Sequence, residues 1–312
     1  MRRIQFLSIV MAVSLVGCPS GGSGTDGSGL EEEQSQSQIE SQCRLFFTLD
    51  VIPGDGVREL RSAVSTDGVT FEMEPEVWLT STSTADPAVR VGSDGTWRLV
   101  TGTLNGDSAV RFSWQAGSPA FPEPEVIIEG GGIPDLIEVE GGWRLYYFQD
   151  SKVLSSFSGD GYSFQKEEGV RLEAPEGMAL AADPTIARRK DGSYVMYFKS
   201  ILPLAELSGP YAGSPYHHVV YRAFSPDGLT WTHENIQLIQ HASVPAAYTD
   251  ANGRVWIYYL NFESPWPDEK ETIWVTYEEE DGSLSVPEQV VFVGGIPENT
   301  WTNNPSPVLH SN

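Results

Sequence analysis

The chain is dominated by a repeated unit of two strands joined by a tight turn. In residues 182–200, Asp183-Pro184 opens a strand, Asp191-Gly192 forms a turn, and a strand rich in aromatic and β-branched residues follows. Four related copies occur at intervals of 49, 48, 61 and 60 residues, counted along Asp86, Asp135, Asp183, Val244 and Asn304. Repeats of this length with several strands each are typical of propeller blades.

A second motif is interleaved with the first. It is a Ser-x-Asp-Gly turn followed, after two intervening residues, by an aromatic residue, and it occurs at Ser65 to Phe71, Ser158 to Phe164 and Ser225 to Trp231. Two motifs that alternate along one chain indicate a repeat architecture built from a single supersecondary unit.

These repeats predict an all-β fold, a five-bladed β-propeller. The expected blades are residues 44–80 with 301–312, 81–130, 131–175, 176–240 and 241–300. The blade of residues 44–80 lacks its own Asp-Pro strand, which Asn304 to Leu309 can supply. We therefore expect the N-terminal and C-terminal strands to pair, which closes the ring and leaves no open sheet edge.

The N-terminal region differs in character from the repeats. Residues 1–17 contain two arginines followed by an apolar run, the layout of a secretory signal, and Cys18 follows directly. Leu15 to Cys18 resembles a bacterial lipobox, which implies a diacylated Cys18 as membrane anchor; the alternative is an ordinary signal peptide. Residues 18–42 are polar and are expected to form a flexible tether. Residues 43–312 form the domain, and the expected location is the bacterial cell envelope, facing the periplasm or the exterior.

Composition excludes several classes of function. The formal net charge of −24 repels nucleic acid, so a nucleic-acid partner is not expected. Cys43 has no second cysteine within the domain and is predicted to be a small buried residue. No phosphate-binding loop or nucleophile elbow is present, and we expect no cofactor and a monomer.

Three acidic residues are the candidate catalytic groups. If the Asp-Pro strands are the innermost strands, Asp86, Asp135 and Asp183 open three adjacent inner strands and converge at one mouth of the channel. Crowded carboxylates shift one another's pKa, which suits acid/base work on a glycosidic bond. The alternative is that each Asp caps a turn through backbone amides before its proline.

With these motifs, residues 44–312 resemble the five-bladed propeller glycosidases of the arabinanase, β-xylosidase and invertase type. The resemblance implies that Asp86 is a base or nucleophile and that Asp135 tunes pKa and orients. It also implies an acid in the third position, where this chain has Asp183 in place of the family's Glu. The candidate acids are therefore Asp183, Glu176 and Glu206.

The Ser-x-Asp-Gly turns resemble the Asp boxes of sialidases. That resemblance implies a structural role, in which Asp67, Asp160 and Asp227 and their serines hydrogen-bond the hairpin. The expected role of these acids is therefore in folding rather than in catalysis.

The remaining candidates concern ligand binding. Trp266, Tyr211 and Trp301 lie in insertions or near the channel end, where a flat ring can stack on a sugar, and Arg90 is the candidate cationic contact. His217 and His218 have no further ligands at metal spacing, so no metal site is expected. The sequence leaves open two alternatives to hydrolysis: a non-catalytic glycan-binding lipoprotein and a protein-interaction scaffold.

Overall fold

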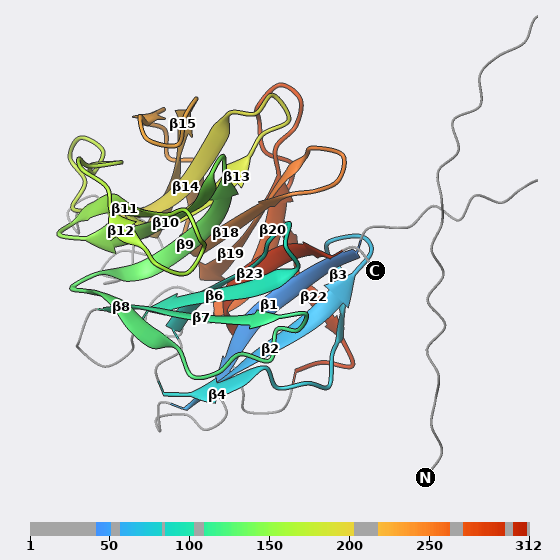
Figure 1. The fold of residues 1–312 in the computed structure, drawn as a ribbon. Coiled ribbons are helices and arrows are strands. Elements are labelled where there is room, and N and C mark those ends of the chain that lie inside the picture. The colour runs from blue at the N-terminus through green and yellow to red at the C-terminus, as the bar shows by residue number, and fades with distance from the viewer. Residues whose placement is uncertain are drawn as a thin grey trace, which may run out of the picture. The chain divides into compact units, whose positions relative to one another are not determined.

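The computed structural model describes residues 42–50, 57–82, 85–102, 109–202, 218–262, 271–296 and 302–310 (Figure 1). Within these ranges the regular structure consists of β-strands arranged in five sheets. The predicted five-bladed β-propeller is therefore confirmed. Each sheet is one blade.

The first two blades have four strands each, in chain order from the inside outward. Blade 1 contains β5 (Ala85–Val91), β6 (Thr96–Gly102), β7 (Ala109–Ala116) and β8 (Glu125–Glu129). Blade 2 contains β9 (Gly132–Val139), β10 (Gly142–Gln149), β11 (Lys152–Ser158) and β12 (Gln165–Lys166).

The next two blades repeat this order. Blade 3 contains β13 (Ala182–Arg188), β14 (Tyr194–Ile201), β15 (His218–Ser225), β16 (Thr232–His233) and β17 (Ile239–Gln240), the last of which pairs with β15. Blade 4 contains β18 (Ala242–Thr249), β19 (Val255–Phe262), β20 (Glu271–Tyr277) and β21 (Glu288–Gln289).

Blade 5 joins the two ends of the described chain. It contains β23 (Thr302–His310), β1 (Gln42–Asp50), β2 (Arg58–Ser65), β3 (Thr70–Met73), β4 (Leu79–Ser81) and β22 (Val291–Val293). The innermost strand, β23, pairs antiparallel with β1, as the repeat spacing predicts, and the two lie side by side in Figure 1.

One predicted boundary is wrong. Residues 241–300 were expected to belong to a single blade, yet β22 pairs in parallel with β3 of blade 5. The physical reason is aromatic packing, because the Phe292 ring lies 5.0 Å from that of Phe47 and 6.3 Å from that of Phe71.

The inner strands form a ring. β5, β9, β13, β18 and β23 each contact the inner strands of both neighbouring blades. The hydrophobic core is divided in the same way, into five clusters that each join two blades. Tyr146 and Val153 of blade 2, for example, pack with Met196 and Phe198 of blade 3. Cys43 is buried, as predicted, with its sulfur 3.8 Å from the Tyr258 hydroxyl, and burial raises the pKa of its thiol to about 11.

Every inner strand contains the same backbone irregularity. The residue before its proline has a positive φ of 46–54°, at Asp86, Ile133, Asp183, Val244 and Asn304. The register with the second strand shifts at each of these sites. A positive φ strains a β-branched residue, so its presence at Ile133 and Val244 shows that the ring enforces this backbone.

These bulges correct the sequence alignment of the repeats. Ile133, which precedes Pro134, is the residue equivalent to Asp86 and Asp183, and Asp135 lies two positions further along β9. The sequence pattern pairs Asp135 with Asp86 and Asp183 because Pro134 has an acidic residue after it, whereas the two Asp-Pro copies have the acid before the proline.

A belt of hydrogen bonds links neighbouring blades at the residue after the proline. In three blades, the side chain at this position accepts a hydrogen bond from a backbone N–H of the next blade: Asp135 Oδ2 from Ile186 (2.7 Å), Thr185 Oγ1 from Ala247 (2.8 Å) and Ser306 Oγ from Val89 (2.8 Å). The N–H groups all belong to the residue two positions after a proline. Because buried N–H groups need acceptors, these side chains hold the ring together.

The two remaining blades depart from the belt in complementary ways. The side chain of Ala246 cannot accept a hydrogen bond. The equivalent residue in blade 5, two positions after the proline, is Pro307, which has no N–H to donate. The side chain of Ala88 cannot accept a hydrogen bond either. The N–H of Leu136 in the next blade donates instead to Oδ1 of Asp135 (2.7 Å). The belt therefore leaves neither of these positions with an unsatisfied donor.

Removing one belt acceptor should destabilise the protein. Ser306→Ala leaves the buried Val89 N–H without its acceptor, which costs about 1–3 kcal/mol. Urea titration followed by circular dichroism should show a loss of that size in the free energy of unfolding. Ser283→Ala, on an exposed turn, should change it by less than about 0.5 kcal/mol. Equal losses of unfolding free energy in the two variants would contradict the stabilising role of the belt hydrogen bonds.

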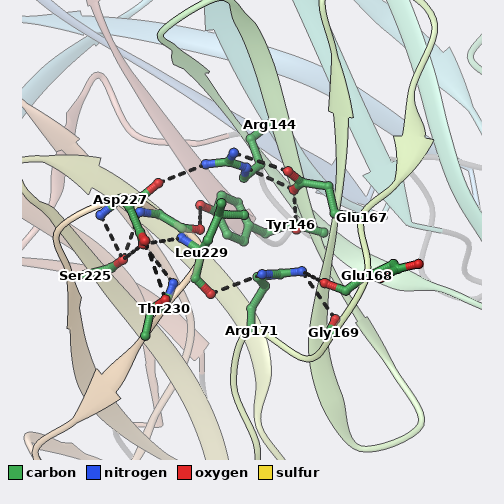
Figure 2. Close-up of polar contacts among 12 residues, drawn as sticks. Arg144, Tyr146, Glu167, Glu168, Gly169, Arg171, Ser225, Asp227, Leu229 and Thr230 are labelled. Atoms are coloured by element: carbon green, nitrogen blue, oxygen red, sulfur yellow. Dashed lines mark hydrogen bonds and ion pairs between the residues drawn. The ribbon is translucent and has the colours of Figure 1, made fainter.

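The Ser-x-Asp-Gly turns join the blades at a second level. Figure 2 shows the turn at 225–230. Inside the turn at 225–230, Asp227 Oδ1 accepts hydrogen bonds from the N–H groups of Leu229 and Thr230, both at 2.8 Å. Blade 2 then binds the backbone carbonyls of this turn: Arg144 donates to that of Asp227 (3.2 Å), and Tyr146 donates to that of Gly228 (2.6 Å). Asp67 and Asp160 accept the same pattern of hydrogen bonds within their turns. All three acids are thus engaged in local structure.

The turn contact can be tested separately. Tyr146→Phe should lower the free energy of unfolding by about 1 kcal/mol, because the buried carbonyl of Gly228 loses the Tyr146 hydroxyl as a donor and keeps only Trp231 Nε1, at 3.1 Å. Thermal unfolding followed by calorimetry would measure the change. The matched control is Tyr259→Phe, since this buried tyrosine donates no side-chain hydrogen bond within the described part of the chain. A comparable loss in the control would contradict the assignment.

Candidate functional site

The bulged ends of the inner strands surround one small pocket. Its volume is about 20 Å³, and all five inner strands line it. The lining includes the three acids expected from the sequence, Asp86, Asp135 and Asp183, together with Arg90. The structure therefore brings these four side chains together, although their surroundings differ.

Asp86 is the least engaged of the three acids. It is half-buried and forms no hydrogen bond or ion pair with the described residues. Burial, followed by the negative charge of Asp183, raises the pKa of Asp86 to about 6, and the positive charges of Lys199 and Arg58 oppose this rise. Its carboxyl group therefore changes protonation state within a pH range that suits general acid or base catalysis.

Asp183 is almost fully buried and is held on one side. Its Oδ2 lies 2.6 Å from the Lys199 ammonium nitrogen and accepts a hydrogen bond from the N–H of Val244 at 3.2 Å. Its Oδ1 is buried and has no hydrogen-bond partner. One oxygen is thus fixed by the protein, while the other is an unsatisfied acceptor.

The carboxylate of Asp135 is engaged by groups of the protein itself. In addition to the two belt hydrogen bonds, it accepts one from the Thr185 hydroxyl (3.1 Å) and forms an ion pair with Arg90 (2.6 Å). Burial raises the pKa of Asp135, and Arg90 is the largest of the opposing influences. Arg90 also donates to the Val89 carbonyl (2.9 Å), so both partners of this ion pair are engaged in the wall of the hub.

Several other sequence candidates are not assigned to the site. Trp266, Tyr211, Trp301, Cys18, Glu206 and His217 lie outside the described residues. Glu176 is exposed before β13, and His218 is partly buried at the start of β15. Within the ranges that the structure describes, no group of three or more His, Cys, Asp or Glu side chains could hold a metal ion, and no helix could span a membrane.

Sequence reasoning missed Lys199. This residue stands on β14, paired with Ala182 across the blade, and reaches the carboxylate of Asp183. The available signal was a single lysine within the strand Tyr194–Ile201, which otherwise consists mainly of apolar residues. A charge in such a strand requires a partner, but only the fold shows which acid supplies it.

Comparisons with known proteins support the fold. No family model matches the chain, and no curated protein matches its sequence. Among solved structures, an endo-arabinase from Bacteroides thetaiotaomicron has a TM-score of 0.51 at 17% identity, covering 73% of this chain and 92% of that one. An endo-1,4-β-xylanase from the same species has a TM-score of 0.55 at 13% identity, covering 78% and 96%.

A third similar structure is a β-fructofuranosidase from Bombyx mori, with a TM-score of 0.56 at 12% identity; the match covers 80% of this chain and 57% of that one. Identities this low establish the fold and leave the activity to be argued from the site. The protein belongs to the architectural class of five-bladed β-propellers, which includes these three enzymes.

The raised pKa of Asp86 predicts a pH-dependent cost to stability. The folded protein holds this proton up to about pH 6, whereas the unfolded chain releases it near pH 4, so ionisation of Asp86 destabilises the fold as pH rises through this window. Asp86→Asn should therefore raise the free energy of unfolding by up to about 3 kcal/mol at pH 7 and by almost nothing at pH 4.

Urea titrations between pH 4 and pH 8 would measure this difference. The control is Asp281→Asn, because hydrogen bonds from Ser283 lower the pKa of that exposed turn carboxyl. This variant should gain no stability at pH 7. A pH-independent effect of Asp86→Asn would contradict the assigned surroundings of Asp86.

Proposed function

We propose that the channel mouth is a carbohydrate site and that the protein is a glycoside hydrolase-like enzyme. The observation that carries this proposal is the unlike pair Asp86 and Asp183. Asp86 is free and protonates near pH 6, while the neighbouring Asp183 is ion-paired with Lys199. Hydrolysis of a glycosidic bond requires one protonated and one ionised carboxyl group.

The fold neighbours give this proposal a context. An endo-arabinase, a xylanase and a β-fructofuranosidase share the architecture, and their names describe action on glycosides. The resemblance seen in the sequence points to the same chemistry. Asp135 would act indirectly, by fixing the wall of the hub on which Asp86 and Asp183 stand. The reaction requires no cofactor.

The cellular setting is also part of the proposal. We infer residues 1–17 as a signal, Cys18 as a lipid anchor, residues 18–42 as a tether and residues 43–312 as a monomeric domain in the bacterial cell envelope. The Ser-x-Asp-Gly turns would be Asp boxes of the sialidase type.

One observation favours a second function, non-catalytic glycan binding. Asp135 and Asp183 both bind protein groups, so Asp86 is the least restricted of the three described acids at the mouth. A site with a single carboxyl group that no protein group engages could orient a sugar through hydrogen bonds without cleaving it.

A screen of aryl glycosides and glycans would separate the two functions. Turnover by the wild-type protein should fall about 10²–10⁴-fold in Asp86→Asn and in Asp183→Asn, as expected for loss of general acid or base catalysis. Asp191→Asn, on an exposed turn at the far end of β13, should retain it. Turnover unaffected by the first two variants would remove the proposed site. Glycan binding without turnover by the wild type would support the second function.

A further inference from the structure

The two oxygens of Asp183 have different surroundings, and this difference defines what the group can do. Oδ2 is fixed from two directions, by Lys199 on the neighbouring strand β14 and by the N–H of Val244 in the next blade. The Lys199 and Asp183 side chains are only 13% and 1% exposed. In a pair this short and this sheltered, each side chain is the other's partner, and a lone buried ammonium would be costly.

The other oxygen of Asp183 has no hydrogen-bond partner among the described residues. Oδ1 is buried without a partner, and Asp183 lines the pocket of about 20 Å³. A pocket needs about 10–15 Å³ to hold one water molecule. A charged acceptor beside a space of this size is suited to binding a water through one of its protons.

Asp86 has the complementary properties. Its carboxyl group is not fixed by any described donor, and Gly102 presents no side chain toward it: a Cβ at Gly102 would lie 3.6 Å from Asp86 Oδ2. The charged groups that act on Asp86 are Asp183 on β13, Lys199 on β14 and Arg58 on β2. The nearby charge of Asp183 favours the protonated form of Asp86.

We propose that Asp183, paired with Lys199, is the base that binds and deprotonates the attacking water, and that Asp86 is the proton donor. This assignment rests on the proposed function and reverses the roles that the family resemblance implies for the two residues. As the glycosidic C–O bond breaks, the leaving oxygen takes the proton of Asp86. The water oxygen bonds to the anomeric carbon, and its proton passes to Asp183 Oδ1. Lys199 is a positioning residue.

The charge arrangement can be tested without a substrate. ¹³C-aspartate NMR of the protein, with Asp86→Asn used to assign the signal, should show Asp86 titrating at about pH 6. Asp183→Asn should move this midpoint to lower pH, because it removes a negative charge. Lys199→Met should move it to higher pH, and Lys199→Arg should restore it. Lys152→Met, at an exposed ion pair on β11, is the control and should leave it unchanged.

Circular dichroism would establish that each variant is folded. If Lys199→Met does not fold, the midpoint is measured in Asp183→Asn and Lys199→Arg. A midpoint that moves in neither Asp183→Asn nor the Lys199 variants would overturn the arrangement.

The roles are tested with the glycoside that is turned over fastest. If Asp86 is the proton donor, the rate should fall as pH rises through about 6, and Lys199→Met should shift this limb to higher pH. Asp86→Asn should also lose at least 10-fold less activity on a dinitrophenyl glycoside than on an alkyl glycoside, since a good leaving group needs little protonation. A rate that falls as pH decreases through about 6, with equal losses on both substrates, would overturn the proposed roles.

The two proposals fail in different ways. If the Asp86 midpoint moves as described and no glycoside is cleaved, the proposed hydrolysis fails and the Lys199–Asp183 arrangement stands. If cleavage occurs with the limb in the opposite direction, hydrolysis stands and the reversed roles fail.

Discussion

The hydrogen bonds between successive inner strands are the interaction on which this ring depends. An inner strand of a propeller exposes backbone donors toward the channel, where no further strand can pair with them. Side chains placed just after the prolines accept these donors across the blade boundary, at Asp135, Thr185 and Ser306. Where such an acceptor is missing, the chain has a proline or another acceptor in compensation. Packing alone would leave those donors unsatisfied.

The same constraint prepares the site. To bring the acceptor of one blade level with the N–H of the next, each inner strand bulges before its proline, and the bulged residue takes a positive φ. These bulges gather at one end of the channel, where Asp86 and Asp183 come to line one pocket. Their proximity and burial then make their carboxyl groups electrostatically unequal. The chemistry of the mouth is thus a consequence of how the ring is held together.

The difference between local sequence signals and contacts between strands explains what the sequence could predict. The repeat spacing was sufficient for five blades and for the pairing of β1 with β23, because turns and strand patterns are local signals. It was insufficient at Asp135, where a proline with an adjacent acid suggested equivalence with Asp183 while the backbone register places Ile133 there. Lys199 could not be assigned at all, since its meaning depends on a carboxylate across the blade, and that pairing is a tertiary fact.

The bulge position itself argues that two of the acids serve more than the fold. Asp and Asn tolerate a positive φ better than most residues, so Asp86 and Asp183 could be there for the backbone alone. Ile133 and Val244 occupy the equivalent positions with β-branched side chains, which shows that the ring does not need that tolerance. Asp86 also carries a raised pKa and hence a stability penalty at neutral pH. A costly carboxyl group in a position that accepts isoleucine is better explained by function than by folding.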